Sequence, residues 1–471
     1  MKKKILTIIL IFLTFQNFAT GLKVENPILY FDDDGVYAQV WVSWKNAWRN
    51  EKNYDGAWLF LKLVGPDGGY IHLKLSDAHQ AVSIEEKTLG LILKSSPDSA
   101  GLFISLAGNY RGDVSAVLKL KLSRNQFPGV AVRQYRLQCY GMEMVYIPAG
   151  AHSIGDTSRS AVANGAYFQS AGNGKPGNIF RINKENDIIE VSDRNGALYY
   201  TGRLAEYEGD KGGPIPAAFP KGVNSFIMMK YEPTQELYAA FLNSLPKSLR
   251  DGHAKLLQSP GYYQLRGTIK KDSSRYLADV KDAPLNFIAW SNALSLADWC
   301  GLRPVTDLEF SKACRGTKNP TAKEYPWGGA SKYLVKRAIA ENGKPYFMGG
   351  IDEKNLTDNN LVTYGASYYW VMDLAGSTWE RVVTLGHSDG RNFTGTHGDG
   401  ILDEAGFATN TDWPAKKGLG GGFGFRGGGF YIQGRDYHEY NPFSPIEYRP
   451  YGSWAGHDVS EAYGCRFVRS W

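Results

Sequence analysis

The chain has 471 residues and contains many glycine and aromatic residues, with 54 Gly, 29 Tyr and 12 Trp. This length allows two or three domains, and this composition favours a loop-rich fold with β-structure over a helical bundle. The formal net charge is +6, of which three charges belong to Lys2, Lys3 and Lys4. The small remainder argues against nucleic acid as a partner.

The first 21 residues have the layout of a secretory signal peptide. Three lysines precede an apolar run from Ile5 to Phe15, and the small residues Ala19 and Gly21 follow it. The run is too short to span a bilayer, and no later apolar run is long enough to do so. We therefore expect residues 1–21 to be removed on export, leaving a protein without a transmembrane anchor in the periplasm, on the cell surface or in the medium.

Residues 22–135 alternate between apolar and polar side chains. Period-two stretches occur at 36–44, 57–63, 70–75 and 114–122, with turn residues such as those at 65–68 between them. Such spacing predicts five to eight short strands and hence a β-sandwich, of immunoglobulin-like type. No pair of carboxylates and no histidine cluster stands out in this region, so we interpret it as an accessory domain.

Helical periodicity appears only after a join near residues 125–129. Stretches 233–243, 291–299 and 306–313 are predicted helices, and Thr306 with Glu309 forms a capping box at the start of the third. Residues 153–222 are polar and rich in glycine, which predicts a long surface insertion.

The four cysteines are Cys139, Cys300, Cys314 and Cys465. Export permits disulfides and leaves three possible full pairings, but the spacing contains no zinc-type cluster. Buried free thiols or one structural bridge are the interpretations that we favour.

A series of short motifs follows in a fixed order from about Met142 to the C-terminus. Each motif has little specificity alone, but the ordered set is highly specific. The motifs lie at 144–150, 229–235, 284–290, 301–310, 313–316, 325–328, 371–380, 424–429 and 464–467. This set resembles the formylglycine-generating enzyme (sulfatase-modifying factor) family.

The resemblance implies that residues 136–471 adopt a loop-rich variant of the C-type lectin fold, which gives an α+β chain overall. Enzymes of the family use copper held by two cysteines to oxidise a substrate cysteine. The matching positions here are Ile432 and Tyr437, which cannot ligate Cu(I). Arg381 also replaces a tryptophan common in the enzymes. We therefore do not expect copper. A non-catalytic role is the interpretation that we favour, and a catalytic role is kept as the alternative.

Structural calcium is the metal that the resemblance favours. The implied ligands are the backbone carbonyls of Ala375, Gly376 and Thr378 with the carboxylate of Glu380, although Ser377 replaces the family's usual asparagine. A second family site would involve Asn342 and a downstream residue such as Asp358. Nearby pairs of histidine and aspartate, at 387–389 and 397–399, could bind a metal, but turn formation is the favoured interpretation.

The stretch 430–463 would lie on the exposed face where the enzymes of the family bind substrate. Aromatic and charged residues alternate there, and such residues contribute much of the binding energy at interfaces. The candidate ligand-binding residues are Tyr431, Arg435, Asp436, Tyr437, His438, Tyr440, Arg449 and Trp454.

Three functions follow from these observations. The first is a non-catalytic binding or scaffold protein that presents this face to an envelope protein or a glycan. The alternative is a formylglycine-generating-type oxidase, or another metal-dependent oxidoreductase acting on a protein cysteine. The third is a carbohydrate-active accessory protein whose N-terminal sandwich binds glycan, which buried Trp41, Trp44 and Trp58 would weaken.

Overall fold

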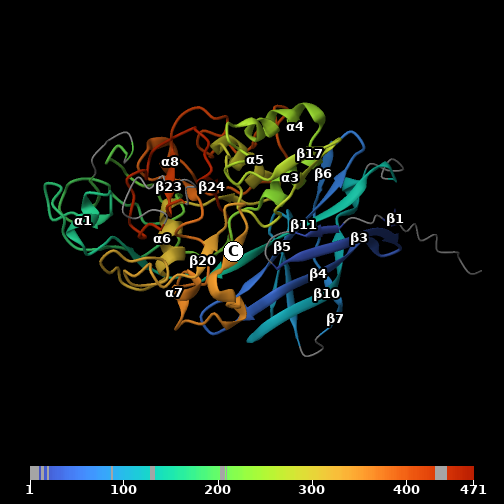
Figure 1. The fold of residues 1–471 in the computed structure, drawn as a ribbon, viewed down its shortest axis with the longest axis horizontal. Coiled ribbons are helices and arrows are strands. Elements are labelled where there is room, and N and C mark those ends of the chain that lie inside the picture. Colours follow the sequence, from blue (N-terminus) through green and yellow to red (C-terminus); the bar gives the residue numbers. More distant parts are fainter. Residues whose placement is uncertain are drawn as a thin grey trace, which may run out of the picture.

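The computed structural model describes residues 10–11, 15–17, 21–85, 89–127, 133–201, 207, 209–429 and 443–471. Its regular structure is mostly strand, with few and short helices, in agreement with an α+β fold. Figure 1 shows two β-layers at one side of the molecule, helices α3, α4 and α5 above them, and a loop-rich part at the other side.

The outer layer is an antiparallel sheet in the order β1-β3-β4-β10-β7, with β2 paired to β3. Its strands are β1 Leu10–Ile11, β2 Phe15–Asn17, β3 Lys23–Asp32, β4 Gly35–Arg49, β7 Gln80–Ile84 and β10 Tyr110–Leu122. The predicted alternation at 36–44 and 114–122 is confirmed, because β4 and β10 pair along nearly their whole length.

The inner layer is an eight-stranded sheet in the order β19-β25-β16-β11-β5-β9-β8, with β6 paired to β5. Its strands are β5 Asp55–Val64, β6 Tyr70–Leu73, β8 Leu91–Ser95, β9 Leu102–Leu106, β11 Arg136–Ile147, β16 Phe226–Met229, β19 Arg303–Pro304 and β25 Phe467–Ser470. The predicted boundary between 22–135 and 136–471 falls at the start of β11. The sheet continues across this boundary, because β11 pairs with β5 on one side and β16 on the other.

Strand β5 shows why the sheet has a layer on each face. Leu59, Leu61 and Leu63 pack into the core between the two sheets, whereas Trp58 and Phe60 pack into the core beneath the helices. Successive side chains of a strand point to opposite faces, so a strand buried on both faces is apolar at both sets of positions.

The three predicted helices are present. They are α3 Gln235–Ser244, α5 Trp290–Trp299 and α6 Asp307–Arg315. In α6 the Thr306 hydroxyl accepts from the Glu309 amide and the Glu309 carboxylate accepts from the Thr306 amide, which confirms the capping box. Trp299 of α5 packs edge-on against Phe60, with ring centroids 5.0 Å apart, and so joins the helical layer to the sheet.

The remaining elements are short. The helical segments are η1 Arg124–Gln126, α1 Arg159–Val162, α4 Lys247–His253, η3 Ala254–Gln258, η4 Met348–Gly350, η5 Glu353–Asn355, α7 Leu361–Tyr364 and α8 Ser388–Arg391. The two-stranded sheets pair β12 His152–Ile154 with β14 Phe180–Ile182, β13 Phe168–Gln169 with β15 Leu198–Tyr199, β17 Ile269–Asp272 with β18 Arg275–Ala278, and β20 Arg337–Ile339 with β21 Pro345–Phe347.

The region predicted as a surface insertion, 153–222, lies at the end of the molecule that carries α1 (Figure 1). It also contributes to the main core, because Ile154, Tyr167, Ile189 and Leu198 are buried there. These apolar side chains anchor an otherwise polar segment.

Within the predicted leader, β1 and β2 pair with β3. This pairing does not test whether residues 1–21 are removed on export, which stays a prediction. In the part of the chain that the structure describes, no helix is both long and apolar enough to cross a membrane.

Candidate functional site

The predicted ligand face is built on a three-stranded sheet in the order β23-β22-β24. The strands are β22 Trp379–Val383, β23 Phe423–Arg426 and β24 Tyr463–Cys465, with β24 parallel to β22. The chain leaves β23 toward residues 430–442, which contain most of the candidate ligand-binding residues. Tyr431, Arg435, Asp436, Tyr437, His438 and Tyr440, together with Ile432, lie outside the described residues.

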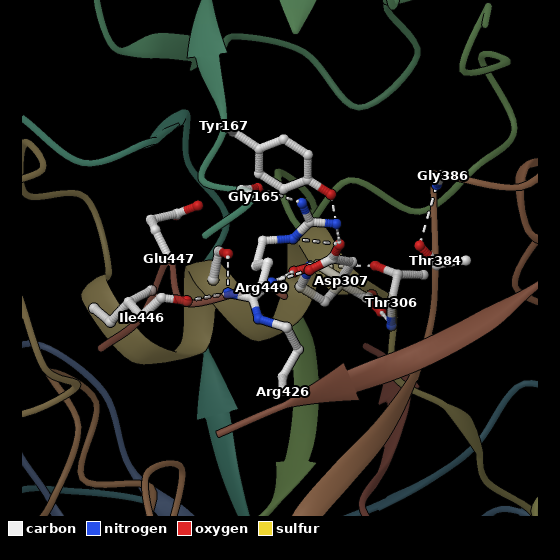
Figure 2. A network of polar contacts seen from close by, with 12 residues as sticks. Gly165, Tyr167, Thr306, Asp307, Thr384, Gly386, Arg426, Ile446, Glu447 and Arg449 are labelled. Atoms are coloured by element: carbon white, nitrogen blue, oxygen red, sulfur yellow. Dashed lines mark hydrogen bonds and ion pairs between the residues drawn. The ribbon is translucent and has the colours of Figure 1, made fainter. Parts of the chain in front are cut away.

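Of the remaining two candidates, Arg449 is fully buried beneath this face. Its Nη2 and Nε donate to one oxygen of Asp307, at 2.6 and 3.1 Å, and its Nη1 donates to the carbonyl of Gly165 at 2.8 Å. The Tyr167 hydroxyl donates to the same Asp307 oxygen at 2.5 Å. Figure 2 shows Tyr167 and Arg449 converging on this carboxylate at the start of α6.

The other oxygen of Asp307 accepts from Arg426, the last residue of β23, which precedes three consecutive glycines. Arg426 also donates to the carbonyl of Ile446 and to the Ser311 hydroxyl. One aspartate therefore joins β23, α6, the inserted segment and the chain just beyond residues 430–442. Burial lowers the pKa of Arg426 to about 10, so its guanidinium stays charged at neutral pH.

A third arginine extends this network and balances its charge. Arg315 Nε lies 2.6 Å from Glu324, and its Nη1 lies 3.4 Å from Glu447. Three guanidinium groups and three carboxylates are thus buried together, which is the condition under which buried charges are tolerated. We call this set, formed by Asp307, Arg315, Glu324, Arg426, Glu447 and Arg449, the buried ion network.

Trp454, the last candidate, lies half-buried in a group of aromatic rings above β23 and β24. Its ring centroid is 5.4 Å from Phe425, 5.7 Å from Tyr207 and 5.8 Å from Tyr451. Tyr463 completes the group at 4.9 Å from Phe425. We call these five residues the aromatic cluster; all but Phe425 keep part of their surface exposed.

Arg381 lies fully buried below the aromatic cluster. Its guanidinium carbon is 4.7 Å from the Phe425 centroid, and its Nη1 and Nη2 donate to the carbonyls of Ile288 and Asp458 at 2.6 and 2.7 Å. Burial lowers the pKa of Arg381 to about 10. The residue ties the sheet to two loops and supports the rings from beneath.

Comparison with known proteins identifies the region that contains this site. A family model described as a sulfatase-modifying factor enzyme 1-like domain matches residues 187–471. The chain belongs to the sulfatase-modifying factor enzyme 1-like family. No curated protein matches the chain.

The family match confirms the resemblance inferred from the ordered motifs. It begins at residue 187, inside the inserted segment, rather than near Met142. The family region therefore contains α3, α5, α6 and the three-stranded sheet of the predicted ligand face, while β11 and the first part of the insertion precede it.

The cysteines of this family member are all free thiols, and all four are buried. Burial raises the pKa of Cys139, Cys300, Cys314 and Cys465, so the reactive thiolate form is disfavoured at neutral pH. The favoured alternative of buried free thiols agrees with this arrangement.

The carboxylate of Glu380, the proposed calcium ligand, is fully buried and bound to Arg466. Arg466 Nη2 lies 2.6 Å from one carboxylate oxygen and Nε 2.8 Å from the other. Glu232 holds the adjoining segment by accepting from the Ser377 hydroxyl at 2.6 Å and the Thr378 amide at 2.9 Å. A calcium ion at Ala375, Gly376 and Thr378 would have to share Glu380 with a guanidinium, so these residues fit an ion pair better than a metal.

The other candidate metal ligands are bound to other groups of the protein. Asn342 accepts from the amide of Lys344 at 3.0 Å, and Asp358 pairs with Lys52. His387 accepts from the Asp389 amide at 3.1 Å, which confirms the turn interpretation for that pair. Within the described ranges, no three His, Cys, Asp or Glu residues are grouped so that they could hold a metal.

Sequence reasoning missed the central role of Asp307 and Tyr167. Asp307 follows the capping residue Thr306, and acidic residues are common in the first turn of any helix, so its sequence context is ordinary. Tyr167 lies in the polar insertion, far from every family motif. Their meeting depends on long-range packing, and no local pattern could have revealed it.

Proposed function

We propose that the protein is an exported, non-catalytic member of the family that binds an envelope protein or a glycan. The observation that carries this proposal is chemical. Ile432 and Tyr437 stand where the enzymes hold copper, and no cysteine lies between Cys314 and Cys465. The four thiols that do exist are fully enclosed, which denies a soft metal or a peptide cysteine access to them.

The proposed ligand surface combines the aromatic cluster with residues 430–442. Half-exposed Tyr451 and Trp454 offer flat apolar rings with polar edges, which suit both sugar rings and protein side chains. The buried ion network fixes the backbone on both sides of 430–442 through Arg426 and Ile446. The described segments that flank residues 430–442 are held in this way and would lose little conformational entropy on binding.

The N-terminal layers favour a supporting role over a glycan-binding role of their own. Trp44 and Trp58 are buried and Trp41 is half-buried, so the three rings cannot form a flat exposed platform together. Within this proposal, residues 22–135 form an immunoglobulin-like accessory sandwich. The family resemblance implies structural calcium at Glu380, but Arg466 already binds both oxygens of that carboxylate, so calcium is not part of this proposal.

The first experiment separates binding from catalysis. Purified protein would be titrated with Cu(I) and incubated with a sulfatase-type cysteine peptide under oxygen, with calcium present. We expect neither tight copper binding nor aldehyde formation. Aldehyde formation would overturn the proposal and support the oxidase alternative. A melting temperature that falls on addition of chelator would support calcium, and an unchanged one would contradict it.

The second experiment tests the ligand surface. The double variant Tyr451→Ala/Trp454→Ala would be compared with Tyr333→Ala/Tyr346→Ala, which removes two exposed tyrosines elsewhere. Both would be screened against immobilised oligosaccharides and solubilised envelope proteins. Loss of a wild-type interaction in the first variant alone is expected. Equal binding by both variants would exclude the aromatic cluster from the ligand surface.

A further inference from the structure

A pocket separate from the proposed ligand surface opens where the N-terminal layers meet the family region. It has a volume of about 160 Å³ and lies between β11, helix α3 and the β17–β18 hairpin. Residues of both parts line it, including Val64 and Arg136 on one side and Asn243 and Arg275 on the other. It shares no residue with the aromatic cluster, so nothing in the proposed function depends on it.

The charges around this pocket are unbalanced. Arg136, Arg275 and Lys281 bring three positive charges, and Glu236 brings one negative charge. Glu236 lies 3.4 Å from Lys281 and is paired with it. Arg136 and Arg275 form no ion pair with any residue that the structure describes. The lining therefore carries an excess of two positive charges and two guanidinium groups without a counter-ion.

The walls of the pocket are held in place before any ligand arrives. Arg136 belongs to β11 and pairs there with Val64 of β5. The hairpin is fixed to α3 because the Asn243 amide donates to the Tyr276 carbonyl and accepts from the Tyr276 amide, both at 2.8 Å. Such fixed walls reduce the entropic cost of binding.

We propose that this pocket binds a sulfate or phosphate group carried by a larger molecule. Guanidinium forks match the oxygens of such groups and bind them through paired, charge-assisted hydrogen bonds. An excess of two positive charges suits a doubly charged phosphate better than a neutral sugar. The small volume accommodates the anionic group while its carrier extends into solvent.

The test is isothermal titration of the full-length protein at low salt with four probes. Inorganic sulfate and inorganic phosphate test the group itself, while glucose 6-sulfate and glucose 6-phosphate show which ester is preferred. We expect saturable binding of at least one probe, weakening as salt screens the charges. Absence of saturable binding to all four would overturn the proposal.

Three variants locate the site. Arg136→Gln/Arg275→Gln should weaken binding by roughly tenfold or more, because two charge-assisted contacts are lost. Lys175→Gln/Lys255→Gln removes the same charge from exposed positions elsewhere and should leave affinity within about twofold. Glu236→Gln removes the one carboxylate and should tighten binding, a gain that misfolding cannot produce. Unchanged affinity in both Arg136→Gln/Arg275→Gln and Glu236→Gln would refute this location.

Discussion

The core between the two large sheets and the loop-rich family region are stabilised by different interactions. Between the sheets, the core consists of aliphatic side chains such as Leu59, Val40 and Leu118 on facing strands. In the family region, the largest fully buried side chains include seven arginines. They are Arg303, Arg315, Arg381, Arg426, Arg449, Arg466 and Arg469.

The difference follows from how each half satisfies its backbone. Strands pair their own amide and carbonyl groups, so only apolar side chains are needed between the sheets. Loops leave carbonyl groups without partners, and a buried carbonyl without a hydrogen bond is costly. Arg466 donates to the carbonyls of Met229 and Met372, and Arg315 donates to those of Ser153 and Gly155. The buried arginines thus replace the missing ladder of hydrogen bonds.

The strongest test of this contrast removes the carboxylate at the centre of the buried ion network. Asp307→Ala would leave Arg426 and Arg449 without their shared counter-ion in the interior. Breaking a buried pair in this way typically costs about 3 to 5 kcal/mol in the free energy of unfolding. Denaturant unfolding of the variant and the wild type would measure the loss.

The matched control is Asp77→Ala, an exposed aspartate, which should change stability by less than about 0.5 kcal/mol. Asp307→Asn tests whether charge or shape matters, since it keeps the side-chain volume. A loss below about 1 kcal/mol for Asp307→Ala would contradict the idea that buried ion pairs hold the loops.

The corresponding test between the sheets is Leu118→Ala in β10. Leu118 is fully buried, and its truncation leaves a cavity, so we expect a loss of about 2 to 4 kcal/mol in unfolding free energy. Val82→Ala on β7 is the control, because Val82 is 58% exposed and should cost little. Equal losses for the two variants would mean that the sheets are not held together by this core.

The same contrast explains what could be predicted from the sequence. Alternation located β4, β5 and β10, and periodicity with the capping box located α3, α5 and α6, because these signals are local. The ordered motifs identified the family for the same reason. The sequence did not reveal that one sheet runs through both halves, or that Arg449 is buried on Asp307. Both depend on contacts between segments far apart in the sequence, such as Val145 with Asp55 and Arg449 with Asp307.

Buried carboxylates also predict how stability depends on pH. Burial raises the pKa of Asp55 to about 7 and that of Glu232 to about 8. A raised pKa means that the folded protein binds the proton more tightly than the unfolded chain does. The stabilisation is therefore complete below the ordinary carboxyl pKa and is lost as pH rises through 7 and 8. Between about pH 6 and pH 8 each group should contribute a loss of about 1 to 2 kcal/mol.

The measurement is a series of melting curves across this pH range. Asp55→Asn and Glu232→Gln keep the neutral form at every pH, so each variant should flatten its part of the decline. A wild-type stability that rises from pH 6 to pH 8 would show that other groups dominate.

The smallest effect concerns the capping box at α6. There, hydrogen bonds of a regular helix and the ion pairs of the buried arginines occur side by side. Thr306→Ala removes the hydroxyl that accepts from the Glu309 amide, and losing such a cap costs about 1 kcal/mol. Glu309 also pairs with Arg303 at 2.6 Å, so the helix start would keep its ion pair. Thr306→Ser keeps the cap and should restore most of the stability. If Thr306→Ala instead costs as much as Asp307→Ala, the helix start supports the buried ion network directly, and the two contributions cannot be separated.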